Sequence, residues 1–528
     1  AHNDKVIIKV TEWPTHDKNP VAEVMMILGK AGDHEAEIHS IMAEFDLPFR
    51  FPESVNLEAE QLKETIEKAE VKRRRDVRGV TTFTIDPADA KDFDDALSVQ
   101  WLKNGNIEVG VHIADVTHYV QPKTELEKEA VERATSVYLV DRTIPMLPER
   151  ISNELCSLRP NEDKLTFSVI FELNNQAKIL NKWFGRTIIH SNRRYAYEEA
   201  QEVIENNKGE YEKELSTLNR LAKILKKRRF ESGAINFETT EVKFELAEDG
   251  TPLGIKPRIR KDAHKLIEEF MLLANRSVAE YVYQRNDGKG KNTFVYRTHD
   301  YPDPEKVETF SLYAKRFGHE LHRDDERIAK SINQLIEEIE GAPEENVLQR
   351  LAIRSMAKAK YTTKASFHFG LAFQHYTHFT SPIRRYPDMM VHRLLHHYLQ
   401  SASPVKPDIY EDHCRHSSDM EKVAASAERA SIKYKQVEFM RNAEDKDYEG
   451  VVSGVTEWGV FVEIIETKCE GMVRMSEMTD DFYEFDEEKM QIIGQRNKTI
   501  ISLGDSCMVR VIGTDIDRRT IDLNFVKQ

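Results

Sequence analysis

The stretch TIDPADAKDFDDAL (residues 84–97) places five aspartates within ten positions: Asp86, Asp89, Asp92, Asp94 and Asp95. Like charges this close repel one another and raise each other's affinity for protons. The stretch lies between two apolar segments, 81–85 and 96–102, that are typical of β-strands, so the chain between them should be partly buried, where unpaired charge is costly. In an extended strand Asp92 and Asp94 would share one face and Asp95 would point away.

Cations between the carboxylates would relieve this repulsion. Pro87 and the small residues Ala88 and Ala90 allow the segment to bend so that the carboxylates meet. A calcium loop of the helix-loop-helix kind is excluded, because no aspartate here is followed by both the required glycine at position six and the glutamate at position twelve. A solvated acidic loop stays an alternative. A buried cluster of oxygen ligands suits Mg²⁺ or Mn²⁺, and a pair of such ions supports displacement at phosphorus.

A second polar segment, HFTSPIRRYPDMMVHRLLHHYL (378–399), carries two adjacent arginines. Ser381 followed by Pro382 has the pattern of an N-cap and a first-turn proline, which predicts that a helix begins there. Arg384 and Arg385 would then lie in the first turn, where the helix dipole disfavours cations, so a phosphate is the expected partner. A salt bridge to an acidic residue is the alternative.

Histidines and cysteines show no pattern of metal ligands. His392 and His396 have i, i+4 helical spacing but lack a third ligand, so we expect packing or hydrogen-bonding roles. His413, Cys414 and His416 lie together without a second ligand pair, and we expect a mixed polar helix face. The four cysteines are far apart, which suits a reducing cytoplasm. No apolar run approaches the length of a membrane helix, so no membrane partner is expected.

Four regions follow one another along the 528 residues. Residues 1–50 have the alternation of short strands, and 51–80 form a charged, partly helical linker. Residues 81–445 mix strands with long helices and predict one α+β domain. Residues 446–528 contain five short strands, typical of a Greek-key barrel of the OB type, which often binds single-stranded nucleic acid. Within 81–445 we expect strands over 81–85, 96–102 and 107–116, a hairpin turn at Asn104 and Gly105, and helices over 123–139, 262–284, 382–399 and about 415–443.

The overall charge leaves the partner open. A net charge of −15 argues against nucleic acid, but a basic groove can coexist with an acidic exterior. Basic clusters occur at 72–75, 226–229 and 256–261, and each is either a solvated surface or a track for phosphates. With 40% hydrophobic and 32% charged residues, the composition is that of an ordinary water-soluble chain.

Four longer motifs, in order along the chain, resemble those of one enzyme family: TIDPADAKDFDDA (84–96), IPMLPERISNELCSLRP (144–160), HKLIEEFMLLAN (264–275) and HFGLAFQHYTHFTSPIRRYPDMMVHR (368–393). On these motifs the chain is identified as a member of the RNB family of exoribonucleases, nearer to its ribonuclease R branch than to ribonuclease II. The resemblance covers nearly the whole chain. It implies a partial cold-shock domain of OB type over 1–50, a charged linker over 51–80, an RNB catalytic domain over 81–445 and an S1-type OB domain over 446–528.

The activity implied by the resemblance is processive, magnesium-dependent 3′→5′ hydrolysis of single-stranded RNA to nucleoside 5′-monophosphates, in RNA degradation and quality control. The cofactor would be Mg²⁺, with Mn²⁺ as the alternative ion and no small-molecule cofactor. The partner would be single-stranded RNA, including RNA with a 3′ overhang, and the chain would be a monomer. Since the chain starts without methionine and lacks parts usual in the family, we expect a trimmed form of a longer protein.

The resemblance also assigns roles to the charged residues. Asp86, Asp92, Asp94 and Asp95 match the family's catalytic, metal-binding aspartates, whereas Asp89 does not and is expected at the surface. The alternative of a catalytically silent RNA-binding scaffold would be marked by loss of one of these carboxylates or of the motif arginine, and all are present.

Further matches concern the contacts to RNA. Arg384 matches the arginine at the scissile phosphate, and Arg385 is its neighbour. Tyr138 and Phe237 match a pair of aromatics that stack on the terminal nucleotide; taken alone, each would be a core aromatic. Stacking holds RNA without selecting a sequence, because every base has a π face. Two glutamates match acids in contact with substrate, with ordinary helix-surface positions as the alternative: Glu268 and Glu428.

Overall fold

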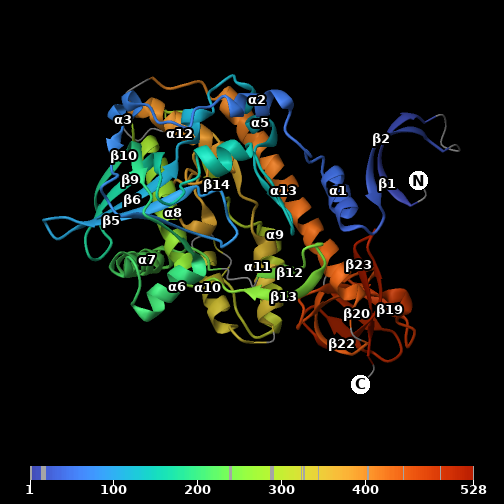
Figure 1. The fold of residues 1–528 in the computed structure, drawn as a ribbon. Coiled ribbons are helices and arrows are strands. Elements are labelled where there is room, and N and C mark those ends of the chain that lie inside the picture. Colours follow the sequence, from blue (N-terminus) through green and yellow to red (C-terminus); the bar gives the residue numbers. More distant parts are fainter. Residues whose placement is uncertain are drawn as a thin grey trace.

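The structure, a computed structural model of the chain, describes residues 3–13, 19–236, 241–285, 291–322, 324, 327–342, 344–400, 403–443, 445–487 and 489–526. A large body of sheet and helices lies on one side of the molecule, a small barrel at the C-terminal end, and a two-stranded ribbon at the N-terminal end (Figure 1). One long helix, α13 (Asp408–Arg441), runs from the body to the barrel.

The body is built on a seven-stranded sheet with the order β11-β4-β5-β6-β9-β10-β3. Neighbouring strands are antiparallel except at the two edges, where β11 pairs with β4 and β3 pairs with β10 in parallel. The inner strands are buried along nearly their whole length although polar residues alternate in them, which indicates that both faces of the sheet are covered. The strands are β3 (Arg75–Asp76), β4 (Thr82–Asp86), β5 (Asp95–Trp101), β6 (Ile107–Ala114), β9 (Asp163–Leu173), β10 (Ile179–His190) and β11 (Arg193–Ala196).

The strands expected over 81–85, 96–102 and 107–116 are β4, β5 and β6. The predicted hairpin turn is confirmed. Gly105 has a φ of +83°, and the backbone N–H of Leu102 donates to the carbonyl of Asn106 over 2.9 Å. The loop has three residues, 103–105, and its last position needs positive φ, which glycine adopts without strain.

Helices pack against the sheet and share one hydrophobic core with it. The helix expected over 262–284 is α8 (Asp262–Gln284), which buries Leu266, Phe270, Leu273 and Val278 as its helical spacing predicts. Helices α6 (Tyr197–Asn206), α7 (Glu212–Glu231) and α12 (Tyr386–Leu399) pack beside it.

The helix expected over 123–139 is shorter than predicted. Helix α5 (Glu125–Arg133) ends where Ala134 takes a left-handed φ of +56°. Val137–Tyr138 then forms β7, which pairs with β8 (Thr143–Ile144) in a short hairpin. The helical spacing of this segment is overridden because its second half packs in another core, against α13 and the N-terminal helix.

Helix α13 begins at Asp408, earlier than the predicted start near 415. Pro407 directly precedes the helix, and the acidic Asp408 and Glu411 lie in its first turn, where the helix dipole favours negative charge. At 1.5 Å per residue its 34 residues span about 50 Å. That length lets α13 contact α5 and α12 in the body as well as strand β22 of the barrel.

A satellite of three helices has a hydrophobic core of its own and leans on the barrel. The hydroxyl of Tyr313 donates to the carbonyl of Lys489, and Arg350 forms an ion pair with Glu463. The helices of the satellite are α9 (Pro304–Arg316), α10 (Ile328–Glu338) and α11 (Glu345–Ser355). The remaining short elements are α4 (Val116–Tyr119), β12 (Glu241–Leu246), β13 (Pro252–Arg258), β14 (Tyr296–Thr298) and β15 (Lys360–Thr362).

The predicted five-stranded barrel is present at the C-terminal end. Its strands close in the order β16-β17-β18-β23-β22, and a three-stranded sheet that was not predicted is inserted after β18. The barrel strands are β16 (Tyr448–Thr456), β17 (Gly459–Ile464), β18 (Glu470–Arg474), β22 (Ser506–Asp515) and β23 (Thr520–Phe525), and the inserted strands are β19 (Tyr483–Asp486), β20 (Gln491–Gly494) and β21 (Ile500–Ser502).

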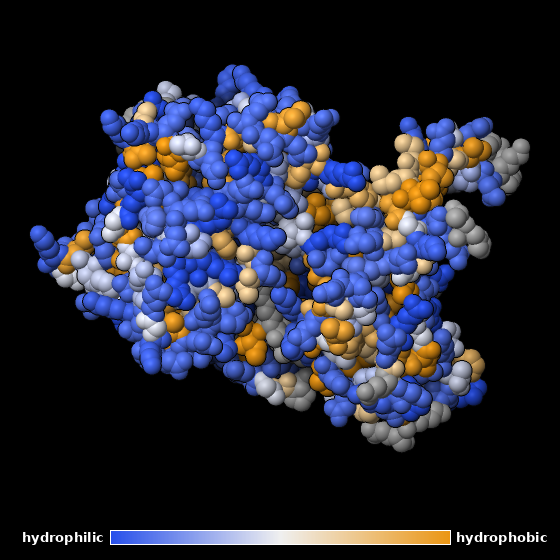
Figure 2. Space-filling model, in the orientation of Figure 1, coloured by the Kyte–Doolittle hydropathy of each residue, from blue (hydrophilic) through white to orange (hydrophobic). Residues whose placement is uncertain are grey.

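The N-terminal region contains β1 (Asp4–Glu12) and β2 (Val21–Lys30), as expected, followed by a helix that was not. Helix α1 (His34–Glu44) has only a weakly apolar face, and it forms because Ile38 and Ile41 pack against α13 and the β7–β8 hairpin. The β1–β2 ribbon exposes several large apolar side chains, visible as an orange patch in Figure 2.

The linker over 51–80 is partly helical, as expected, with α2 (Glu53–Glu60) and α3 (Lys68–Arg73) before β3. Helix α2 packs against α5 and so ties the linker to the body. Within the described part of the chain, every helix is too short or too polar to cross a bilayer.

Gly459 provides a test of the barrel. Its φ is +152°, and a Cβ there would lie 2.2 Å from the backbone carbonyl oxygen of Val473. Gly459→Ala should therefore lower the free energy of unfolding of the barrel by several kcal/mol, since backbone cannot move aside as a flexible side chain can. Gly513→Ala is the matched control, because its Cβ meets only Asp522 Oδ2 at 3.9 Å. Equal thermal unfolding of the two variants would contradict the expected clash.

Candidate active site

The motif aspartates lie at the junction of two paired strands. Asp86 ends β4, Asp95 begins β5, and the loop between them carries Asp92 and Asp94. The two strands pair antiparallel, so the loop folds back on itself as the predicted bend requires. Asp86 and Asp94 are buried, whereas Asp92 and Asp95 are half-buried. Asp89 is exposed and forms an ion pair with Lys243, which confirms its expected surface position.

Burial disfavours the ionised form of all four, and repulsion from neighbouring carboxylates adds to this effect at Asp86 and Asp94. Burial, together with repulsion from Asp95, raises the pKa of Asp86 to about 8. Burial also raises the pKa of Asp95 to about 6, although Arg384 and Arg385 oppose this shift. The pKa of Asp94 is raised well above its ordinary value and that of Asp92 is raised, in both cases chiefly by burial. Added positive charge would therefore stabilise this site in its ionised form.

The donor set fits a divalent cation. All four groups offer hard carboxylate oxygens, and Asp86 Oδ2 is buried with no hydrogen-bond partner. Among the described residues, no group of three or more aspartate, glutamate, histidine or cysteine side chains already converges as a metal site. The meeting of all four carboxylates around ions thus stays a prediction.

Ser157, which the sequence argument did not single out, anchors the loop. Its buried Oγ accepts from the backbone N–H of Phe93 over 3.0 Å and donates to the carbonyl of Lys91 over 2.7 Å. Arg194 holds the other side of the loop, with Nη2 donating to the carbonyl of Ala88 over 2.9 Å. Ser157 belongs to the quoted motif 144–160, so the only sequence signal for it was the family resemblance.

Asp94 ties this loop to the second motif. Its Oδ1 accepts from the backbone N–H of Ile383 over 2.9 Å, and its own carbonyl accepts from the N–H of Ala114 over 2.9 Å. The second carboxylate oxygen, Oδ2, lies 3.8 Å from Nε of Arg384. The structure thus brings together two motifs that are separated by 289 residues.

The predicted helix start at Ser381 is wrong. Helix α12 begins at Tyr386 with Arg385 as its N-cap, and Pro387 rather than Pro382 is the proline of its first turn. The reason is a side chain that the sequence pattern did not weigh: Asp388 Oδ1 accepts from the backbone N–H of Ser381 over 2.7 Å and holds 381–385 as a turn in front of the helix.

The two arginines have different environments. Arg384 lies in the turn with its side chain 40% exposed, and its Nη2 donates to Ser381 Oγ over 3.1 Å. Arg385 is largely buried, and its Nη2 donates to the buried Asp388 Oδ1 over 2.8 Å. Both arginines have an ion pair with an aspartate, as the salt-bridge alternative has it, but only Arg384 keeps a large part of its side chain exposed, and its contact with a phosphate stays a prediction.

Tyr138 lies in the same neighbourhood. It is 40% exposed, which excludes the alternative of a core aromatic. Burial of part of the side chain raises its pKa to about 12; Asp92 and Asp94 raise this pKa further and Arg384 lowers it. The backbone N–H of Ser136, two residues before Tyr138, donates to the carbonyl of Arg384 over 3.0 Å, so the phenol lies near the segment that carries the two arginines.

The remaining predicted contacts lie elsewhere or cannot be placed. Glu268, near the start of α8, accepts from Nη2 of Arg260 over 2.5 Å. Glu428 is exposed on α13. The structure brings neither into contact with the aspartates, and Phe237 lies outside the described residues.

The histidines behave as expected. His392 is buried, and its Nε2 lies 2.7 Å from the carbonyl oxygen of Phe379. His416 uses its Nε2 in the same way with the carbonyl of Glu132, and Cys414 is buried in the core. Packing and hydrogen bonding account for these side chains.

Comparisons with known proteins identify the family of the chain. An RNB domain profile matches residues 74–401, a cold shock domain profile matches 1–52, and an S1 RNA binding domain profile matches 441–525. Ribonuclease R of Aquifex aeolicus is 38% identical over 532 residues, covering 99% of this chain and 75% of the relative. The chain belongs to the RNB family. Ribonuclease R of Thermotoga maritima is 39% identical over 547 residues, with coverage of 100% and 75%.

Solved structures of the family show the same fold. RNase R of Mycoplasma genitalium, in complex with ribose-methylated single-stranded RNA, matches with a TM-score of 0.92 and 25% identity, covering 99% of this chain and 83% of that one. Yeast Ssd1, described as a pseudonuclease, matches with a TM-score of 0.71 and 21% identity over 93% of this chain and 62% of that one. The RNB fold is therefore shared by proteins with and without nuclease activity.

The raised carboxylate pKa values predict how cation binding depends on pH. Their folded values lie above the ordinary one, so protonation favours the folded, metal-free state, and this contribution is lost as pH rises through about 6 to 8. Mg²⁺ or Mn²⁺ should therefore release protons near pH 7 and bind more tightly at pH 8.5. Calorimetry in buffers of different ionisation enthalpy measures the release. Asp86→Asn should reduce it; pH-independent binding without proton release would contradict the assignment.

Ser157→Ala tests the loop anchor. It leaves the buried N–H of Phe93 without its acceptor, which should lower the free energy of unfolding by about 1–3 kcal/mol. RNA hydrolysis should also slow, because the loop that holds Asp92 and Asp94 loses its tether. Denaturant unfolding and steady-state kinetics measure the two effects, with the exposed Ser232→Ala as the control. Unchanged activity in a destabilised Ser157→Ala protein would show that the tether does not position the aspartates.

Proposed function

We propose that this RNB-family ribonuclease hydrolyses single-stranded RNA from its 3′ end with Mg²⁺, or alternatively Mn²⁺, held by Asp86, Asp92, Asp94 and Asp95. One observation carries the proposal: four carboxylates with raised pKa values lie beside an exposed arginine, and a buried oxygen of Asp86 has no partner within the described protein. Buried charge without compensation is costly, and several carboxyl groups with raised pKa values in one place are typical of a site that binds a charged ligand.

Each group of the site has a proposed task. A bound pair of divalent ions would supply an activated water and charge stabilisation for the leaving oxygen. Arg384, whose Nε lies 3.8 Å from Asp94 Oδ2, would turn its exposed guanidinium edge to the scissile phosphate. Arg385 would act indirectly, because its bond to Asp388 holds the turn that carries Arg384.

The terminal nucleotide would be held by stacking. Tyr138 offers a 40% exposed ring beside the aspartates, and we assign it to the terminal base. Phe237 as the second aromatic, and Glu268 and Glu428 as substrate contacts, rest on the family resemblance alone. After each cleavage the RNA would advance by one nucleotide without dissociating, so nucleoside 5′-monophosphates would be released processively.

The flanking regions would capture RNA. We assign RNA binding to the cold-shock region over 1–50 and to the S1 barrel over 446–528. Between them, the linker over 51–80 leads into the catalytic domain over 81–445. The substrates would include RNA with a 3′ overhang, and the cellular task would be RNA degradation and quality control by a cytoplasmic monomer.

The alternative is a silent RNA-binding scaffold. The fold by itself does not decide, because the yeast pseudonuclease shares it. The catalytic reading of the site rests on the intact carboxylates and on Arg384. Only a cleavage assay separates the two.

The variant Asp94→Asn, compared with wild type in a cleavage assay, tests the proposal. Asparagine keeps an Oδ1 acceptor for the N–H of Ile383 but removes the negative charge, so folding should survive. RNA hydrolysis should fall by roughly two to three orders of magnitude or more, while RNA binding persists or tightens. The readout is the ladder from 5′-labelled single-stranded RNA with Mg²⁺ or chelator. Asp89→Asn, at a side chain that is 73% exposed, should match wild type. A wild-type ladder from Asp94→Asn would refute the metal site.

A further inference from the structure

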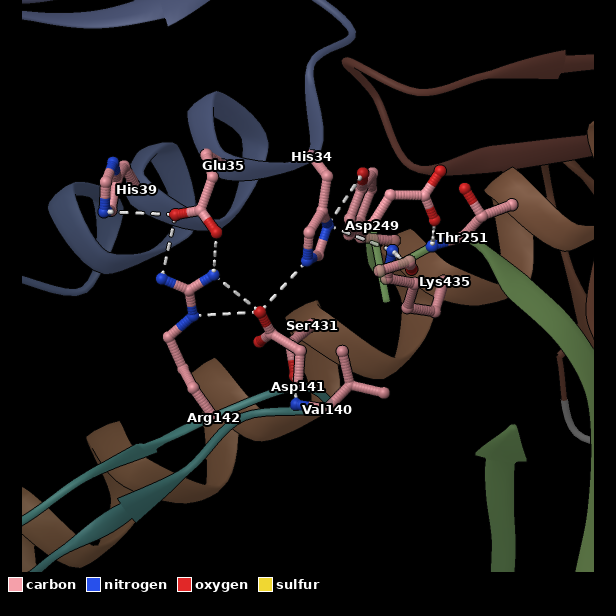
Figure 3. Close-up of polar contacts among 12 residues, drawn as sticks. His34, Glu35, His39, Val140, Asp141, Arg142, Asp249, Thr251, Ser431 and Lys435 are labelled. Carbon is pink, nitrogen blue, oxygen red and sulfur yellow. Dashed lines mark hydrogen bonds and ion pairs between the residues drawn. The ribbon is translucent and has the colours of Figure 1, made fainter. Parts of the chain in front are cut away.

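A polar network that runs from the exposed Glu35 to the buried Lys435 joins the N-terminal region to the hairpin that carries Tyr138 (Figure 3). Arg142 donates from Nη2 to Glu35 Oε1 over 2.6 Å and from Nε to Asp141 Oδ2 over 2.9 Å. His34 Nε2 lies 3.0 Å from the same Asp141 oxygen, and Lys435 Nζ lies 3.0 Å from His34 Nδ1. We call these five residues the junction.

The hydrogen bonds of the junction run in one direction. An ammonium has no lone pair, so Lys435 donates to Nδ1 of His34, and the ring's Nε2–H then donates to Asp141. Lys435 is fully buried and also donates to Glu438 Oε2 over 2.6 Å and to the carbonyl of Gly250. A buried ammonium requires all of these partners, so the geometry around His34 is well defined.

The junction holds the turn of the β7–β8 hairpin. Asp141 and Arg142 form that turn, in which the N–H of Leu139 donates to the carbonyl of Arg142 over 2.8 Å. The N–H of Val140 donates to Ser431 Oγ on α13 over 3.1 Å. Tyr138 lies in β7, paired with Thr143 and only three residues from Asp141.

The hairpin's two faces have different neighbours. Val137, Leu139 and Ile144 are buried in one core with Ile38 and Ile41 of α1. Since side chains alternate along a strand, Tyr138 points away from this core, where its ring is 40% exposed. A hairpin with two residues in each strand is unstable alone, so its position depends on what it packs against.

The other end of the hairpin is bonded to the catalytic turn. The N–H of Ser136 donates to the carbonyl of Arg384 over 3.0 Å, and the N–H of Tyr386 donates to the carbonyl of Ala134 over 2.9 Å. The segment around Tyr138 therefore spans from the arginine turn at one end to α1 at the other.

We infer that the junction is a positioning device for Tyr138, through which helix α1 of the cold-shock region holds the ring in place for the terminal nucleotide. Asp141 and Arg142 are its positioning residues, and they act through Tyr138 without touching RNA or the reacting atoms. The inference rests on the proposed stacking role of Tyr138. It predicts that the grip on the last nucleotides depends on a region far from the aspartates in sequence.

The test is to measure KM and kcat with short RNA substrates, because stacking of the terminal base contributes a large share of their binding free energy. Asp141→Asn and Arg142→Gln should each raise KM for a pentaribonucleotide about tenfold, within the worth of one stacked base, while kcat stays within about twofold. Arg142→Gln breaks the pairs with Glu35 and Asp141 at a part-exposed side chain and leaves the buried bond between His34 and Asp141 in place, so it should preserve folding even if Asp141→Asn does not. A KM near wild type for both variants would overturn the inference.

Two matched controls sharpen the result. Glu44→Gln removes a charge from the same helix but breaks only its pair with Arg519 of the barrel, so KM should not change. In a Tyr138→Ala background, Arg142→Gln should have no further effect on KM, because the residue it positions is gone. A full tenfold effect persisting in that background would overturn the junction's role. If Tyr138→Ala alone leaves KM unchanged, the stacking assignment itself fails and the inference falls with it.

Discussion

Burial of four carboxyl groups at one strand junction is the constraint on which the rest of the site depends. The β4–β5 pairing forces Asp86 and Asp95 together, and the folded loop adds Asp92 and Asp94. The protein holds this arrangement with neutral hydrogen bonds to the loop backbone, chiefly from Ser157. Nearby arginines oppose the rise in pKa, yet the pKa values of all four carboxyl groups stay raised, so a cation would stabilise their ionised forms.

The turn 381–385 is the second support of the site. The N–H of Ile383 orients Asp94, and Asp388 holds the turn through the N–H of Ser381 and the guanidinium of Arg385. Arg385 is thereby bonded to a buried carboxylate, while the side chain of Arg384 remains half-exposed. The two neighbouring arginines thus have different surroundings, because the carboxylate of Asp388 bonds only to Arg385 among them.

The flanking regions are connected to this centre through the hairpin of Tyr138 and through α13. The hairpin is bonded to the arginine turn on one side and packed against α1 on the other. Helix α13 contacts the body, α1 and the barrel, so it serves as a common backing for all three parts. The cold-shock region, the S1 barrel and the aspartate site are therefore linked by packing and hydrogen bonds rather than by peptide chain alone.

The sequence alone determined whatever depends on neighbouring residues. Apolar spacing predicted α8, the Asn104–Gly105 turn predicted the β5–β6 hairpin, and alternation with turns predicted the barrel. The crowded aspartates indicated a cation site, and longer motifs indicated the RNB family. These signals are local, because helix period, turn geometry and like-charge repulsion act over a few residues.

Tertiary structure decided what depends on partners distant in the chain. Helix α12 begins later than predicted because the side chain of Asp388 accepts from the N–H of Ser381. Helix α1 forms because it packs against the β7–β8 hairpin and α13. The anchor at Ser157 lies 64 residues from Phe93, and Ile383 lies 289 residues from Asp94. Sequence spacing carries no information on such contacts, since folding of the whole core brings them together.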